Sequence, residues 1–228
     1  MVDDKKGVSF GAGLLFTLVA LAVMIFAILN RIAPNHSEPQ PSHEIASPTS
    51  TEEKQSRKKR SAEFAAEKAR IKQLEKHFVI TTDEFDGIKT YRHRVFSKFM
   101  NGNGTTIEAE IHENGNARRI FVESEYVSND WIFHDSIQVQ AKGIVPVASS
   151  GKTQHEVING GGVCEVTRPS VEQSILIANA IKAASDSHQP VRVRLSGRFD
   201  KDFTLRAAHE QAIAETYELY SLLASPSQ

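Results

Sequence analysis

The pattern of hydrophobic and polar residues divides the chain into four segments behind a short charged tail, residues 1–7. Residues 8–29 contain no charged side chain and are rich in Leu, Val, Ala, Phe and Ile. Residues 30–50 are mostly Pro, Ser, Thr, His, Gln and Glu, whereas residues 51–77 are highly charged and lack Gly and Pro. Residues 78–225 alternate between short apolar and polar runs. These segments predict a transmembrane helix, a disordered linker, a charged helical stalk and one globular domain.

The apolar run at residues 8–29 is long enough to cross a bilayer. An α-helix rises about 1.5 Å per residue, so roughly 20 apolar residues span the ~30 Å hydrocarbon layer. A cleaved signal peptide is one alternative, but such peptides have shorter apolar cores that end at small residues, and here Arg31 and Pro34 follow the run. A buried helix of a soluble protein is the other alternative. We interpret the run as an uncleaved anchor in the lipid bilayer.

The basic residues beside the span predict its orientation. Lys5 and Lys6 precede it, whereas Arg31 is the only basic residue close behind it. Positive charge near a span favours the cytoplasmic side. The chain is therefore expected to be a single-pass protein of the inner (plasma) membrane, with residues 1–7 as a cytoplasmic tail and the C-terminal domain outside the cytoplasm. In the opposite orientation, the basic run at residues 57–60 would contact anionic lipids.

Charge and cysteine content exclude some classes of domain. Residues 77–228 carry fifteen Lys and Arg against nineteen Asp and Glu. A domain with this net charge of −4 is not a nucleic-acid binder by its composition. Cys164 is the only cysteine, so the domain cannot contain an intramolecular disulfide.

The stalk carries a weak heptad pattern. Phe64, Ile71 and Phe78 recur at intervals of seven residues, but Glu67 and Lys68 interrupt the seam that a coiled coil requires. A charged spacer helix whose last turn docks on the domain is the preferred interpretation. Self-association through a short coiled coil is the alternative.

Several segments of the domain alternate apolar and polar side chains, which is typical of strands that bury one face. They lie at residues 78–81, 90–96, 106–113, 118–127, 131–140, 163–166 and 191–195. Gly115 between two asparagines predicts a hairpin turn. One helix is expected from a capping box of Ser170 and Gln173, and a second over residues 207–223. The fold class is therefore α+β, a mainly antiparallel β-sheet with two helices on one face.

Three runs of the domain resemble a recurring set of bacterial extracytoplasmic α+β domains with no established activity. The runs are Asp83 to Ile88, Tyr91 to Arg94 and Asp130 to Phe133. That set places an Asp-Trp strand in mid-domain and follows it with a glycine-containing turn, a helix, a strand and a terminal helix. Its members often follow a lipoprotein signal or a membrane helix. The resemblance covers residues 79–223, implies the same fold and location, and transfers no catalytic residue.

Two arginine pairs and one aromatic pair are candidates for a binding surface. Residues two apart share a strand face, and the pairs are Arg92 with Arg94, Arg192 with Arg194, and Trp131 with Phe133. If the two arginine strands were neighbours, four guanidinium groups would form an anion-binding surface. The alternative is cross-strand pairing with Glu108, Glu110, Glu123 and Glu125. For the aromatic pair the alternatives are core packing and a ligand-stacking platform.

No catalytic or metal-binding motif in the sequence is complete. The run Ser150 to Thr153 resembles the end of a P-loop, but Pro146 occupies the position where that loop needs a glycine. His209 and Glu210 resemble the start of a zinc-protease helix, but position 213 is Ile, so this pair is expected on the surface. A scattered active site would have to draw on His93, His134, Cys164, Asp83, Asp86 and the four glutamates, and a zinc site on His93, His134 and Cys164, whose spacing matches no known ligand pattern. The sequence therefore predicts no catalytic residue, no cofactor and no metal.

The leading hypothesis is a membrane-anchored, non-catalytic accessory or binding domain of the cell envelope with a protein partner. The first alternative is an enzyme whose active site is assembled from scattered residues. The second is a structural protein that forms a weak homo-oligomer through its anchor and stalk, since small residues at the start of the anchor and just before it allow helices to approach closely. Those residues are Gly7, Gly11 and Gly13.

Overall fold

The computed structural model describes residues 50–97, 104–158 and 161–225. The tail, the membrane span and nearly all of the linker expected from the sequence lie outside these residues. Among the described residues, no helix is both long and apolar enough to cross a membrane.

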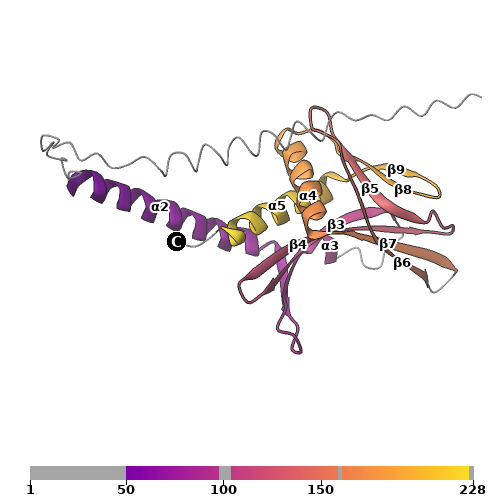
Figure 1. The fold of residues 1–228 in the computed structure, drawn as a ribbon, viewed down its shortest axis with the longest axis horizontal. Helices are drawn as coiled ribbons and strands as arrows, with labels where there is room; N and C mark the ends of the chain where they lie inside the picture. Colours follow the sequence, from indigo (N-terminus) through magenta and orange to yellow (C-terminus); the bar gives the residue numbers. More distant parts are fainter. Residues whose placement is uncertain (1–49, 98–103, 159–160, 226–228) are drawn as a thin grey trace, which may run out of the picture. The chain divides into compact units, whose positions relative to one another are not determined.

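The described residues form a nine-stranded sheet in which all neighbouring strands are antiparallel (Figure 1). The strands are β1 (Phe78–Thr82), β2 (Lys89–His93), β3 (Thr106–Asn114), β4 (Ala117–Ser128), β5 (His134–Gln140), β6 (Val147–Ile158), β7 (Gly162–Pro169), β8 (Arg192–Gly197) and β9 (Lys201–Thr204). Their order across the sheet is β1-β2-β3-β4-β7-β6-β5-β8-β9. The α+β class with a mainly antiparallel sheet is thus confirmed.

Strand β6 connects the two halves of the sheet. Its first residues, 147–150, pair with β5, and residues 151–158 pair with β7. Gly151 lies where the pairing changes, and a Cβ atom there would collide with the backbone carbonyl of Arg168 on β7. A glycine is therefore needed at this close approach of two backbones.

Helices α4 (Val171–Asp186) and α5 (Ala207–Ala224) lie against one face of the sheet (Figure 1). The apolar side chains that alternate along β3 and β4 face these helices and form the main core with them. Its largest fully buried members include Ile107, Ile120, Ile177, Ile181 and Ile213. Helix α4 begins at the expected capping box, in which Ser170 and Gln173 each bond the backbone N–H of the other at 3.3 Å.

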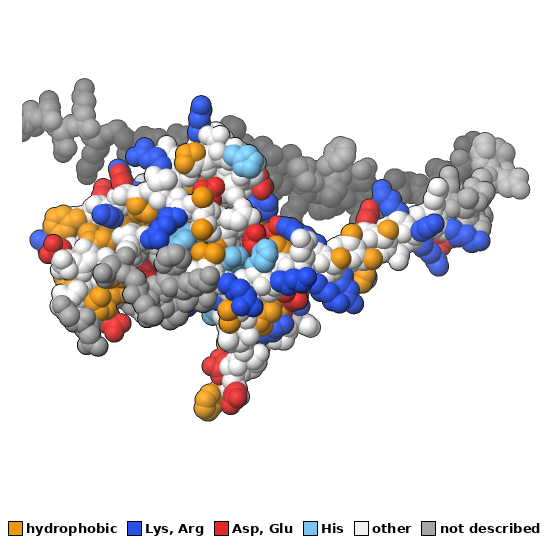
Figure 2. Space-filling view, turned by 180° about the vertical axis from the view of Figure 1, so that it is seen from behind, with side chains coloured by type: hydrophobic (Ala, Val, Ile, Leu, Met, Phe, Trp, Pro, Cys, Tyr) orange, Lys and Arg blue, Asp and Glu red, His pale blue; other side chains and the backbone are white. Residues whose placement is uncertain are grey.

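Helix α2 (Ser50–Glu75) is highly charged, and its last turns pack on the domain. Leu74 joins a second, smaller core cluster with Phe78 and Leu219. Arg70 donates two hydrogen bonds to the carboxylate of Glu218 on α5, at 2.6 and 2.8 Å. The side chains of residues 53–66 on α2 are exposed, and many are basic (Figure 2).

The strand expected at residues 90–96 is shorter in the structure, where it ends at His93. The chain continues as a single helical turn, α3 (Arg94–Ser97). In a continuous strand, Val95 and Phe96 would point to opposite faces of the sheet. The helical turn lets both side chains pack against the main core, which explains why the strand stops.

Candidate functional site

Three aromatic rings gather beside the start of β5 in what we call the aromatic corner: Trp131, Phe133 and His155. The centroids of the Trp131 and Phe133 rings lie 5.9 Å apart with an interplanar angle of 24°. The ring of His155, on β6, lies 5.5 Å from that of Trp131 and 5.8 Å from that of Phe133. Phe133 is 43% exposed and His155 is also exposed. The corner is therefore an aromatic surface open to solvent.

Trp131 and Phe133 do not lie on a strand, contrary to the sequence-based expectation for residues 131–140. Strand β5 begins only at His134, and Phe133 has φ of +53°. This left-handed backbone conformation is uncommon for a residue with a bulky side chain. Trp131 and Phe133 are thus brought together by a tight loop rather than by strand alternation.

A buried glutamate holds that loop in place. The carboxylate of Glu165, on β7, accepts hydrogen bonds from the backbone N–H groups of Ile132, Phe133 and His134 at 2.6, 3.0 and 2.9 Å. Burial opposes ionisation of Glu165, but these backbone donors and the His134 ring outweigh it and lower the pKa of the carboxyl group. An ionised side chain with no exposed surface therefore fixes three consecutive residues of the corner.

Glu165 also belongs to a hydrogen-bonded chain that resembles a serine–histidine–acid arrangement. Nδ1 of His134 lies 3.1 Å from Glu165, and Nε2 of His134 lies 2.9 Å from Oγ of Ser124. Burial lowers the pKa of His134 despite the nearby carboxylate, so the ring is neutral and donates to Glu165 from Nδ1. All three side chains are fully buried. The three side chains therefore form a buried hydrogen-bonded network that supports the loop from within the domain.

The β8–β9 hairpin supports the corner from the other side. The backbone N–H of Phe199 donates to the carbonyl of Ile132 at 3.1 Å. A Cβ atom on Gly197 would collide with the carbonyl of Phe133, so glycine permits this close packing. Phe199 is itself 55% exposed, and the guanidinium of Arg198 lies 5.6 Å from its ring centroid. The hairpin thereby adds an aromatic ring and a cation beside the corner.

The four arginines that could have formed an anion-binding surface are not brought together. Arg92 is on β2 and Arg94 on α3, whereas Arg192 and Arg194 are on β8. Strands β2 and β8 are separated by β3, β4, β7, β6 and β5. Arg194 instead forms a bidentate ion pair with Asp202 on β9, at 2.6 and 2.7 Å.

The sheet face opposite the helices carries a network of charges. Arg92 is ion-paired with Glu108, and Arg168 with Glu123. Glu108 and Glu123 are direct cross-strand partners, an arrangement of like charges that the two arginines offset. Burial raises the pKa of Glu108 against the opposing effect of Arg92. Of the four candidate arginines, Arg92 therefore shows the expected cross-strand pairing with one of the four glutamates.

The residues proposed for a scattered active site also lie apart. His93 and His134 are buried on the helix-covered face of the sheet, on strands at different positions in its order. Cys164 is adjacent to the inward-facing Glu165, so its side chain points to the opposite face. Burial raises the pKa of the Cys164 thiol, and the nearby carboxylates of Glu125 and Glu156 add to this effect, so the thiol stays protonated.

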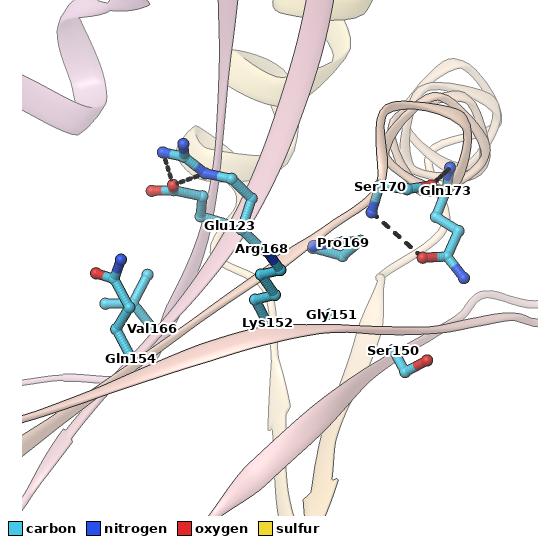
Figure 3. Close-up of a pocket in the computed structure, with 10 residues that line it drawn as sticks. All are labelled: Glu123, Ser150, Gly151, Lys152, Gln154, Val166, Arg168, Pro169, Ser170 and Gln173. Carbon is cyan, nitrogen blue, oxygen red and sulfur yellow. Dashed lines mark hydrogen bonds and ion pairs between the residues drawn. The ribbon is translucent and has the colours of Figure 1, made fainter.

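A hollow with a volume of about 700 Å³ lies where β6 changes its pairing partner (Figure 3). Lys152, Arg168, Pro169 and the capping residues of α4 line it. Arg168 is held by Glu123 on one side, and Ser170 and Gln173 bond each other on the other side (Figure 3). The P-loop-like run from Ser150 to Thr153 is part of strand β6 and forms no loop around this hollow.

Two histidines have partners that the sequence did not indicate. His209 was expected on the surface but is buried, and its Nδ1 lies 2.7 Å from Oγ1 of Thr106. His93 lies beside His77 and Glu215, and the potential ligand atoms of these three residues are all within 4.8 Å of one another. They are the described group best placed to hold a metal ion.

Comparison of the chain with models of protein families, with curated proteins and with solved structures finds no match.

Proposed function

We propose that this chain is a membrane-anchored, non-catalytic binding domain of the cell envelope that contacts a partner protein through the aromatic corner. The single observation that carries the proposal is the clamp of Glu165 on the loop that presents Trp131 and Phe133. The uncharged run at residues 8–29 and the charged helix α2 support the anchor and the spacer.

The chemistry of the corner suits a protein interface. Aromatic residues are enriched where interfaces bury most of their binding energy, and Trp and Tyr are the commonest aromatic anchors. Trp131 and Phe133 present two nearly parallel rings, and His155 adds a polar ring at their edge. A partner would bury this apolar surface without disturbing the core of the sheet.

The corner is also rigid, which favours binding. Ordering side chains and loops on association costs affinity, so a surface that is already fixed binds more tightly. Glu165 fixes the backbone on both sides of Phe133, and Gly197 allows β8 to pack directly against it. Non-glycine residues in a left-handed conformation are concentrated at functional sites, where the surrounding structure compensates for the strain.

A photocrosslinking amino acid placed in living cells tests this proposal. It should replace Phe133 in one variant and Phe85, the fully exposed residue of the β1–β2 turn, in a control variant. We expect a discrete crosslinked product from position 133, none from position 85, and loss of the product when Trp131→Ala is added. Identical products from both positions, or none from position 133, would overturn the assignment of the corner.

The location is tested separately. A reporter that is active only outside the cytoplasm, fused after Gln228, should be active, and a cytoplasm-only reporter at the same place should be silent. The reverse result would contradict the envelope location while leaving the aromatic corner as a binding surface for a cytoplasmic partner.

A further inference from the structure

Three potential metal ligands meet where helix α2 joins the sheet. His77 lies in the turn between α2 and β1, His93 is the last residue of β2, and Glu215 is on α5. Oε2 of Glu215 lies 2.6 Å from Nδ1 of His77 and 3.0 Å from Nε2 of His93. Segments far apart in the sequence therefore direct three donor atoms toward one point.

The spacing of these atoms fits a small tetrahedral ion. Zinc bonds to imidazole nitrogen and carboxylate oxygen at about 2.0–2.2 Å, which places neighbouring ligand atoms of a tetrahedral site roughly 3.3 Å apart. To meet that value, the separation of Glu215 from His77 needs to grow by about 0.7 Å and that from His93 by about 0.3 Å. His77 can make this adjustment, because 49% of its side chain is exposed.

The surroundings already orient the carboxylate. The side-chain amide of Gln211, one turn earlier on α5, donates to Oε1 of Glu215 at 2.9 Å. This leaves Oε2 directed at the two imidazoles. Groups that hold the ligands of a metal ion in this way are a regular part of metal sites.

We propose that His77, His93 and Glu215 bind one zinc ion, with the fourth position open to water. Two imidazoles and one carboxylate are the protein ligands of many open zinc sites. The turn after helix α2, strand β2 and helix α5 each supply one ligand, so the ion joins the end of α2 to the domain. The site adjoins the ion pair of Arg70 with Glu218 and is separate from the aromatic corner, so the two proposals stand independently.

Ion binding changes the proton positions of His93. The backbone N–H of Val95 donates to Nδ1 of His93 at 3.2 Å, so the neutral ring carries its proton on Nε2, facing Glu215. When the ion occupies Nε2, this proton moves to Nδ1, and the Val95 amide loses its acceptor. The Val95 amide is therefore a reporter of the bound state that lies outside the ligand set.

The test uses the full-length chain purified in detergent without a polyhistidine tag. Zinc and cobalt(II) are titrated into the wild type, His77→Ala and Glu215→Gln, with His112→Ala as the matched control. His112 is also paired with a glutamate, at 2.8 Å from Glu110, but it has no second histidine beside it in the described structure. His93 is left unchanged because it is buried and its loss would disturb folding.

We expect one equivalent of zinc to bind, cobalt to give the strong visible absorption of a tetrahedral site, and the Val95 amide resonance to shift. His77→Ala and Glu215→Gln should each weaken binding at least tenfold while keeping the circular dichroism of the wild type, and His112→Ala should bind normally. Equal affinity in wild type and His77→Ala would overturn the proposal, as would an unchanged Val95 resonance at saturating zinc. Loss of binding in His112→Ala would place the ion at another site.

Discussion

The carboxylate of Glu165 accepts a hydrogen bond from the backbone N–H of Phe133 at 3.0 Å, and Phe133 has φ of +53°. A left-handed conformation costs a residue with a Cβ atom about 1–2 kcal/mol. A fully buried carboxylate is costly as well, unless it is well hydrogen-bonded. Here the two unfavourable features compensate each other, because the loop directs three N–H groups at one acceptor.

Replacing Glu165 with Gln is therefore expected to destabilise the fold by about 3 kcal/mol, since breaking a buried charged network costs roughly this much. The neutral amide offers one acceptor oxygen in place of two, and its NH₂ group would face backbone donors. Urea unfolding measures the loss. Glu156→Gln, an exposed neighbour on β6, is the control and should change the stability by less than ~0.5 kcal/mol. Equal effects of the two substitutions would contradict the clamp.

Stability should fall as the pH drops below about 6.5, the ordinary pKa of histidine. Burial lowers the pKa of His134 and of His209, where Arg206 adds to the effect. The unfolded chain then binds protons that the folded chain does not, so each histidine removes up to about 1.4 kcal/mol per pH unit. The lowered pKa of Glu165 extends the loss below about pH 4.3, because the unfolded carboxylate protonates first.

Urea unfolding between pH 7.5 and 5.0 measures this slope. His209→Asn should reduce the slope of stability with pH by roughly 1.4 kcal/mol per pH unit, which corresponds to about one bound proton. This holds even if the substitution also lowers the stability at every pH. A slope that His209→Asn leaves unchanged would show that other groups account for the pH dependence.

Local sequence patterns predicted most of the elements because each leaves a short-range signature. The capping box marked the start of α4, and Gly115 marked the β3–β4 hairpin, where its φ is +58°. Strand β6 escaped prediction because its inward positions, such as Ser149 and Thr153, are small and polar and show no apolar alternation. Strand β9 is only four residues long and has a single inward aromatic ring.

The aromatic corner could be predicted only in part. Trp131 and Phe133 were recognised as a candidate surface, but His155 and Glu165 are distant in sequence and reach the corner through the pairing of β6 with β7. The one available signal was Glu165, a charged residue in the otherwise apolar run of residues 163–166. A charge at an inward position requires buried donors, and these donors are the N–H groups of the loop.

Removing the charge of Glu125 should stabilise the protein. Glu125 is half-buried on β4. Burial raises the pKa of its carboxyl group, and the charge of Glu123 adds to this effect, although Arg92 lowers the pKa. Its charge is therefore unfavourable in the folded state, and Glu125→Gln should add about 0.5–1 kcal/mol at pH 7. This gain should shrink as the pH falls through the raised pKa, since the wild-type carboxyl group then also becomes neutral.

Glu113→Gln is the matched control for Glu125→Gln, because Glu113 on the adjacent strand is ion-paired with Arg118 at 2.9 Å. It should lower the stability by up to ~0.5–1 kcal/mol. The two glutamine substitutions are thus expected to act in opposite directions in urea unfolding. Loss of stability in both variants would contradict the inference that the charge of Glu125 is unfavourable in the folded state.

The attachment of helix α2 to the domain should depend more on Leu74 than on Arg70. Leu74 is almost completely buried beside Phe78 and Leu219, so Leu74→Ala should cost about 2–4 kcal/mol through lost burial and a cavity. The ion pair of Arg70 with Glu218 is partly exposed, and such pairs contribute at most about 1 kcal/mol. Tryptic cleavage after Lys76, in the turn between α2 and β1, reports release of the helix. It should accelerate strongly in Leu74→Ala and only slightly in Arg70→Ala, and the reverse order would mean that charge rather than packing holds helix α2 in place.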